Sequence, residues 1–135
     1  MYSIKDISEK FNLPASAIRY YEEIGLLENV EHKNGYHRIY DESHVDRLNA
    51  IECFKKARLP LKEIKLFFEY EKDMKNNSQK IVEMMNAQKK ETEKEIKNLK
   101  AGLAHLEKKI KYYSIVDEAV KSGKKIPSWQ EVIGK

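Results

Sequence analysis

The sequence has 135 residues, of which 36% are charged and 41% hydrophobic, and its 26 Lys and Arg residues leave a net charge of +4. This length fits one domain, but the balance is lean for a single globular core, so we expect an elongated chain that partly associates with itself. No apolar run approaches the roughly 18 residues that span a bilayer, and the N-terminus lacks the blocks of a signal peptide, so no membrane association is expected and the cytoplasm is the predicted compartment.

Two short helices joined by a tight turn are predicted at the start of the chain. Ser3 and Asp6 have the spacing of a capping pair at a helix N-terminus, and apolar residues then repeat at helical spacing as far as Asn12. Pro14 suits the first turn of a second helix, which Gly25 should end because glycine readily adopts a left-handed backbone. Such a pair is a helix-turn-helix unit.

A β-hairpin and a second pair of helices are predicted next. Asn34 and Gly35 favour a two-residue hairpin turn, and the strand-forming residues behind them indicate a small β-wing. Asp41 can cap a third helix, which the Leu-Pro pair at Leu59 interrupts before a fourth begins. The same pair occurs at Leu13, which predicts two helix-turn-helix units on either side of the hairpin.

From about Ser78 the composition indicates a long polar helix with one narrow apolar stripe. Its positions step by threes and fours, as in the seam of a coiled coil. They are Ile81, Met85, Gln88, Thr92, Ile96, Leu99, Leu103, Leu106, Ile110 and Tyr113. Consecutive steps of four around Thr92 make a stutter, where the supercoil should locally unwind. A helix of about 35 residues with such a stripe needs a partner, and an identical chain is the simplest one.

Taken together, the segments IKDISEKFNLPASAIRYYEEIGLL, NGYHRIYDESHVDRL and LPLKEI closely resemble the MerR family of bacterial transcription regulators. The resemblance implies a mainly α fold. It comprises a winged helix-turn-helix DNA-binding domain over residues 1–75, a dimerisation helix over 76–115 that forms an antiparallel coiled coil, and a short tail over 116–135. It also implies a homodimer that binds double-stranded promoter DNA with an overlong spacer and distorts it for RNA polymerase. No cofactor and no enzymatic activity are expected.

The resemblance also assigns DNA contacts residue by residue. Ser16, Arg19 and Tyr20 would contact DNA from the second helix, which as the recognition helix meets the major groove. In the wing, Tyr36 would hold the DNA backbone together with His37 or Arg38. The wing is one residue longer than the family pattern, which leaves open which of the last two takes the phosphate.

Two further departures concern the wing and the third helix. Glu31 and His32 stand where the family often has arginines, which predicts a modest salt dependence of DNA binding. Arg58 replaces the glycine that commonly ends the third helix, so the turn there is expected to differ, since a left-handed cap strains other residues.

Cys53 is the one cysteine of the chain and lies beside Lys55 and Lys56. No histidine shares a helical face with it, so no metal site is predicted. The segment IECFKKARLPLKEI resembles the single-cysteine subgroup of the family that responds to aldehydes and other electrophiles, which implies a sensor thiol. The ammonium group of Lys56 would favour the nucleophilic thiolate. In the alternative reading Cys53 is a small hydrophobic residue packed in the second helix-turn-helix unit.

The tail is too short for a separate drug-binding domain. Ile126, Trp129 and Val132 are expected to dock on the dimer, with ligand binding as the alternative. Three functions stay open: a regulator switched at Cys53 by electrophiles, a regulator with an unidentified small ligand and an inert thiol, and an architectural DNA-binding or coiled-coil protein without an effector. A thiol enzyme is disfavoured because no histidine is placed to act as its base.

Overall fold

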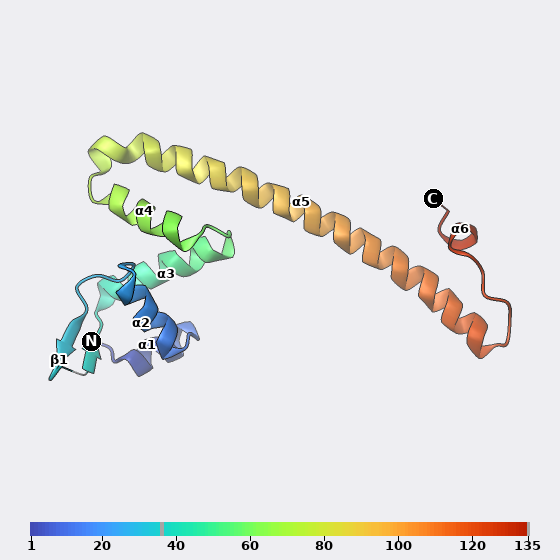
Figure 1. Ribbon diagram of the computed structural model, residues 1–135, viewed down its shortest axis with the longest axis horizontal. Coiled ribbons are helices and arrows are strands. Elements are labelled where there is room, and N and C mark those ends of the chain that lie inside the picture. The colour runs from blue at the N-terminus through green and yellow to red at the C-terminus, as the bar shows by residue number, and fades with distance from the viewer. Residues whose placement is uncertain (36, 135) are drawn as a thin grey trace. The chain divides into compact units, whose positions relative to one another are not determined.

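A computed structural model describes residues 1–35 and 37–134, and helices predominate in it. The mainly α fold expected from the sequence is confirmed. The elements in chain order are α1 (Ile4–Phe11), α2 (Ala15–Glu23), β1 (Glu31–Lys33), β2 (His37–Ile39), α3 (Glu42–Lys56), α4 (Leu61–Glu71), α5 (Met74–Lys121) and α6 (Trp129–Val132) (Figure 1). The chain divides into two compact units, Met1–Lys90 and Glu91–Lys135.

Helices α1 and α2 lie where the sequence indicated, except that α2 begins one residue later than predicted. The Ser3 hydroxyl accepts a 3.1 Å hydrogen bond from the Asp6 amide, and the Asp6 carboxylate accepts one of 2.9 Å from the Ser3 amide. Asn12 ends α1 with a φ of 52°, and Gly25 follows α2 with a φ of 86°. Pro14 is the N-cap of α2, so it precedes the first helical turn and does not belong to it.

The turns of the two helix-turn-helix units have the same backbone geometry, as the repeated Leu-Pro pair predicted. Asn12 and Arg58 are both left-handed, with φ values of 52° and 64°. The prolines two residues further on have φ values of −66° and −61° and cap α2 and α4. The expectation of a different turn at Arg58 is therefore wrong. Two hydrogen bonds close this turn and hold the strained residue, from Leu59 N to Phe54 O at 3.0 Å and from Arg58 N to Lys55 O at 2.9 Å.

Strands β1 and β2 form an antiparallel hairpin. The register pairs Glu31 with Ile39, His32 with Arg38 and Lys33 with His37. Asn34 and Gly35 both have positive φ values, 55° and 74°, as predicted. Three residues nevertheless separate Lys33 from His37, so the connection is one residue longer than the expected two-residue turn.

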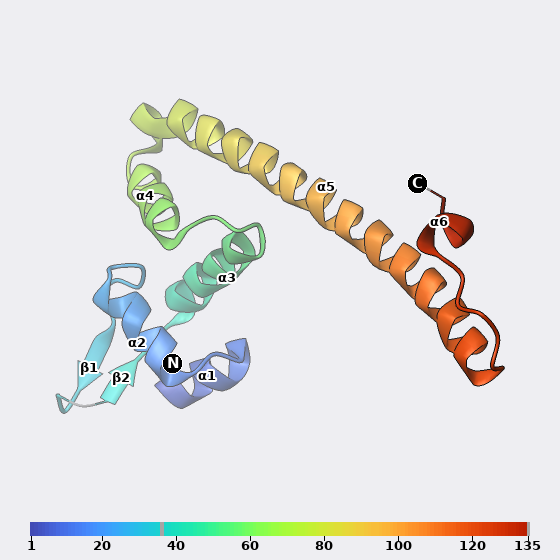
Figure 2. The ribbon, with the colours of Figure 1, turned by 45° about the vertical axis from the view of Figure 1, so that its right-hand side comes forward.

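Helices α1 to α4 and the two strands of the wing lie together in the first unit (Figure 2). One core of buried side chains joins both helix-turn-helix pairs to the base of the wing. Its buried side chains are Ile7, Ile18, Tyr21, Leu26, Leu27, Tyr40, Val45, Leu48, Ile51, Leu59, Ile64 and Phe68. Backbone groups of Tyr2 and Tyr40 exchange two hydrogen bonds of 2.8 Å, which tie the start of the chain to the end of β2. Asp41 caps α3 as predicted, accepting from the Ser43 and His44 amides.

Helix α5 is longer than its seam suggested. It has 48 residues, begins at Met74 and ends at Lys121, whereas the seam indicated about 35 residues from Ser78. The additional residues, 74–77 and 114–121, lie outside the predicted seam, although the second segment includes the apolar residues Ile115, Ala119 and Val120. No helix in residues 1–35 and 37–134 is both long and apolar enough to cross a bilayer.

Candidate nucleic-acid interface and thiol

Helix α2 divides its side chains between the core and solvent. Ile18 and Tyr21 are buried, which confirms that Tyr21 belongs to the core. Ser16 and Arg19 are exposed on the other side, and Tyr20 is 48% exposed although its ring is apolar. These three predicted DNA contacts are thus free to reach a ligand from one helix, which is how a recognition helix presents its side chains.

The wing adds a second group of polar side chains beside α2. His32 and Arg38 are cross-strand partners, and both reach Glu22 near the end of α2. His37 pairs with Lys33 instead and is exposed. Of the two candidates in β2, Arg38 thus has a carboxylate partner on α2, whereas His37 is exposed on the hairpin. Tyr36, the remaining predicted contact, lies outside the described residues.

Glu22 is the centre of a charged cluster that sequence reasoning missed. Its Oε2 atom accepts from Arg38 Nε at 2.7 Å, and its Oε1 atom lies 2.7 Å from His32 Nε2. Burial alone would raise the pKa of the Glu22 carboxyl, but the hydrogen bonds from Arg38 and His32 outweigh it and hold that pKa below its ordinary value. The negative charge of Glu22 is therefore stabilised at neutral pH.

Tyr40 lies beneath this cluster and is fully buried. Its hydroxyl has no hydrogen-bond partner among the residues that the structure describes, and its ring packs edge-on against His44 at 5.6 Å. Burial, with a contribution from the Glu22 charge, raises the pKa of Tyr40 to about 12. The Tyr40 side chain thus stays neutral while it supports the junction of the wing with α2.

Cys53 lies on α3 with its side chain exposed. Within the single chain, Cys53 is therefore not part of the core. Lys56, its proposed electrostatic partner, is exposed on the same helix. Lys55 points elsewhere, because its Nζ donates to the Tyr21 hydroxyl at 2.8 Å, and this hydrogen bond raises the pKa of Lys55.

The end of α3 is linked to α5 through Ala57. The Ala57 amide donates to the Cys53 carbonyl at 3.3 Å, and the Ala57 carbonyl accepts from Gln88 Nε2 at 2.8 Å. Gln88 was expected in the seam between two chains, and Met85 beside it packs against the core of its own unit. Met85 and Gln88, which were predicted to face a second chain, thus contact residues of their own chain.

The chain was compared with known protein families. Residues 2–71, more than half of the chain, match the family of MerR HTH regulatory proteins. The chain belongs to the MerR family. It is accordingly a DNA-binding transcription regulator.

Several MerR-family relatives are similar over different lengths. The HTH-type transcriptional regulator AdhR of Bacillus subtilis is 34% identical over 59 residues, which are 44% of this chain and 42% of AdhR, so the match spans less than half of that protein. An uncharacterised HTH-type regulator of Haemophilus influenzae is 28% identical over 112 residues, 83% of each chain. The crystal structure of HiNmlR, a MerR family regulator lacking the sensor domain and bound to promoter DNA, has a TM-score of 0.77 at 27% identity and covers 91% of both chains.

The second unit of this MerR-family chain exposes the rest of the seam. Six apolar side chains of α5 are between 46% and 69% exposed and continue the steps of three and four: Ile96, Leu99, Leu103, Leu106, Ile110 and Tyr113. A row of this kind on one helix face is typical of a helix that packs against another.

The tail packs on α5 of its own chain, whereas the sequence led us to expect docking on the dimer. The Tyr112 hydroxyl donates to the Pro127 carbonyl at 2.9 Å, and the rings of Tyr112 and Trp129 meet edge-on at 5.2 Å. Lys109 Nζ lies 4.7 Å from the centre of the Trp129 ring. Ile126, by contrast, is 51% exposed.

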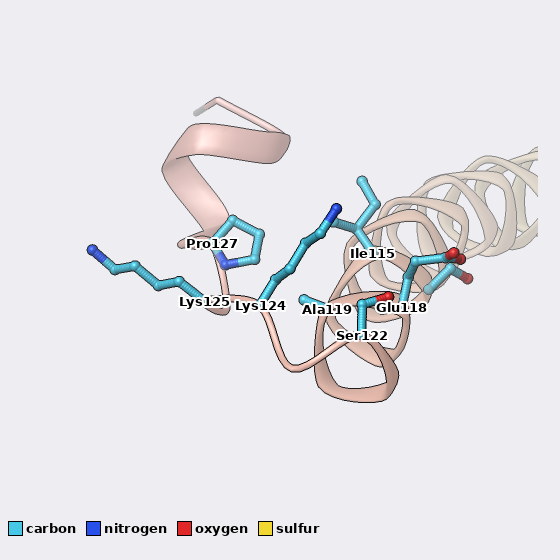
Figure 3. Close-up of a pocket in the computed structure, with 8 residues that line it drawn as sticks. Ile115, Glu118, Ala119, Ser122, Lys124, Lys125 and Pro127 are labelled. Atoms are coloured by element: carbon cyan, nitrogen blue, oxygen red, sulfur yellow. The ribbon is translucent and has the colours of Figure 1, made fainter.

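A hollow of about 470 Å³ lies between the end of α5 and the tail. Ile115, Ala119 and Pro127 supply its apolar surface (Figure 3). In Figure 3 Lys124 extends towards the helix, whereas Lys125 extends away from it. The volume suits a small organic molecule. No group of three or more His, Cys, Asp and Glu side chains in residues 1–35 and 37–134 is placed to hold a metal ion.

Proposed function

We propose that this MerR-family regulator is a homodimer that binds and distorts a promoter with an overlong spacer for RNA polymerase, and that modification of Cys53 by aldehydes or related electrophiles changes its activity. The observation that carries the proposal is the exposed Cys53 thiol on a helix whose end is hydrogen-bonded to α5. The proposal assigns DNA binding to residues 1–75, dimerisation to 76–115 and the tail to 116–135.

The proposed DNA contacts come from α2 and the wing. Ser16, Arg19 and Tyr20 would reach the major groove and its flanking phosphates. Tyr36, His37 and Arg38 would hold the backbone at the wing. The front half of the chain carries 11 Lys and Arg against 12 Asp and Glu, so a few placed cations, and not bulk charge, would provide the attraction.

The proposed dimer would use the exposed seam of α5. Six large apolar side chains along one face need a partner surface of the same kind, and a second copy of α5 provides it. The contact of α5 with its own tail would not compete with dimerisation. Tyr112 faces the tail, whereas the neighbouring Tyr113 belongs to the seam, about 100° further around the helix.

The proposed switch is a covalent change at Cys53. The thiolate adds to the carbonyl carbon of an aldehyde, an S–C bond forms as the C–O π bond breaks, and the oxygen takes up a proton to give a hemithioacetal. The adduct lies one helical turn before Ala57, whose carbonyl receives the Gln88 hydrogen bond. A displacement of the end of α3 would therefore move or break the hydrogen bond to Gln88 of α5.

Transcription in vitro from the promoter upstream of this protein's own gene tests the proposal. Formaldehyde or methylglyoxal should activate transcription with wild type and not with Cys53→Ser, because serine lacks the nucleophilic sulfur. Lys56→Gln, the matched variant one turn away, keeps the sulfur and should retain the response. An equal response from wild type and Cys53→Ser would eliminate Cys53 as the sensor.

The hollow beside the tail supports a second candidate, a regulator with a small ligand and an inert thiol. Its apolar surface and the adjacent Lys124 would suit a small organic anion. In this case, with a small carboxylate such as benzoate as the probe in place of the aldehyde, Cys53→Ser would respond as wild type does, whereas Ala119→Trp, which fills the hollow, would not. DNA occupancy without any change in transcription would instead favour a purely architectural role.

A further inference from the structure

The carboxylate of Glu22 joins two elements that are expected to bind DNA. Glu22 belongs to α2, whereas His32 and Arg38 belong to β1 and β2 and face each other across the hairpin. Both Glu22 oxygens are engaged, each at 2.7 Å, and the side chain is only 20% exposed. The wing is therefore attached to the recognition helix by a charged link at the middle of its strands.

This link uses the Nε atom of Arg38, which donates to Glu22 Oε2 at 2.7 Å. The guanidinium group carries further N–H donors on its two terminal nitrogens, and these are the donors that a phosphate would require. The planar guanidinium is then held in one orientation, and less conformational entropy is lost when it pairs with a phosphate. With 26% of its side chain exposed, Arg38 is partly accessible to such a ligand.

The wing itself has little intrinsic stability. Each strand has three residues, and a two-stranded hairpin of this size is marginal in water without contacts to the rest of the protein. The Tyr2–Tyr40 bridge fixes the end of β2, and Glu22 fixes the paired His32 and Arg38. The distance between the wing and α2 thus depends on this carboxylate.

We propose that Glu22 is a positioning residue for DNA binding, whose carboxylate holds Arg38 and His32 in place, so that a negative charge strengthens the binding of a polyanion. The inference rests on the proposed contact of the wing with the DNA backbone. It makes Glu22 a determinant of affinity although Glu22 itself does not touch DNA.

The direction in which Glu22→Gln changes the affinity for DNA distinguishes a positioning role of Glu22 from charge repulsion alone. A carboxylate near phosphates repels them, so charge alone predicts that Glu22→Gln binds DNA more tightly. If Glu22 positions the wing, Glu22→Gln should instead bind more weakly, by about tenfold, because a charge-assisted link is lost. Glu23→Gln is the matched control, since Glu23 is the next residue of α2, is exposed and carries the same charge.

The experiment measures the affinity of the full-length protein for a promoter fragment by fluorescence anisotropy at fixed salt. We expect weaker binding with Glu22→Gln and unchanged or tighter binding with Glu23→Gln. Glu22→Asp, which keeps the charge but shortens the side chain, should also weaken binding and serves where Glu22→Gln does not fold. Unchanged or tighter binding with Glu22→Gln, or with Glu22→Asp in its place, would overturn the inference.

A double-mutant cycle tests whether Glu22 acts through Arg38. In the Arg38→Gln background, Glu22→Gln should cause little further loss of affinity, whereas additive losses would overturn the proposed link. The two proposals fail differently. Full affinity with Arg38→Gln alone would refute the proposed contact of Arg38 with DNA and with it this inference. A loss with Arg38→Gln but none with Glu22→Gln would refute this inference only.

Discussion

The buried hydroxyl of Tyr40 illustrates how single residues support the DNA-binding surface. It lies close enough to Glu22, Arg38 and Arg19 for their charges to act on it, yet it makes no hydrogen bond with any described residue. A buried polar group without a partner costs free energy. The aromatic ring of Tyr40 is thus the part that stabilises the fold.

Tyr40→Phe should stabilise the protein. Removing the hydroxyl eliminates an unsatisfied buried group and leaves the ring contact with His44 in place, so the free energy of unfolding should rise by about 1 kcal/mol. Urea denaturation measures this change. A decrease of similar size would mean that the hydroxyl has a partner in solution.

The Glu22 link should make stability depend on pH. Because hydrogen bonds lower the pKa of Glu22 in the folded state, its contribution is present above the unfolded value of about 4.3 and is lost as the pH falls through the lower folded value. Glu22→Gln should therefore be less stable than wild type by about 1 kcal/mol at pH 7. The free energies of unfolding of the two proteins should converge below about pH 4, as the carboxyl becomes protonated. Urea denaturation at several pH values measures them, and a difference that stays constant with pH would contradict this.

At the scale of elements, the glycine that ends α2 has a geometric role. Gly25 has a φ of 86°, and a Cβ atom there would lie 3.2 Å from the Lys65 side chain. The amides of Gly25 and Leu26 donate to carbonyls of α2, which closes the helix end. Gly102 differs, because it lies inside α5 and a Cβ atom there would meet nothing within 4 Å.

Opposite effects are expected from alanine at these two glycines. Gly25→Ala should lower the free energy of unfolding by about 1 to 2 kcal/mol through backbone strain and the contact with Lys65. Gly102→Ala should raise the helix stability by up to about 1 kcal/mol. Thermal unfolding of both variants checks this, and destabilisation by Gly102→Ala would indicate that a partner chain approaches α5 closely there.

At the scale of the whole molecule, the exposed seam is the feature that a single chain does not explain. Its six apolar residues follow the spacing of a coiled coil, whereas the earlier seam positions Met85 and Gln88 contact the first unit of their own chain. One helix thus combines two tasks. It braces its own DNA-binding unit over one part of its length and exposes an apolar face over the other.

Leu103→Glu should dissociate the proposed dimer. Leu103 is 57% exposed in the chain, and a charge in the seam would have to be buried twice, so the dimer dissociation constant should rise at least a hundredfold. Sedimentation equilibrium measures it. Ala101→Glu, on a different face of the same turn, is the control and should leave the dimer intact.

Much of the fold was predictable because its determinants are local. The capping pair at Ser3, the left-handed residue Gly25, the Leu-Pro turns and the heptad spacing each depend on residues a few positions apart. Such signals survive in any tertiary context. The bounds of α5 were less predictable, because the turns at its two ends lie outside the seam repeat that indicated the helix.

The sequence by itself determined the helix-turn-helix pairs, the wing and the apolar seam, since short-range sterics and periodicity fix them. Only the tertiary structure decided that Cys53 is exposed, that Gln88 binds the Ala57 carbonyl 31 residues away, and that Glu22 links α2 to His32 and Arg38, 10 and 16 residues further on. Contacts between residues this far apart in the sequence do not follow from the repeat of a helix or a strand. The contacts exist because packing of the core brings the elements together, and the orientation of each side chain depends on that packing.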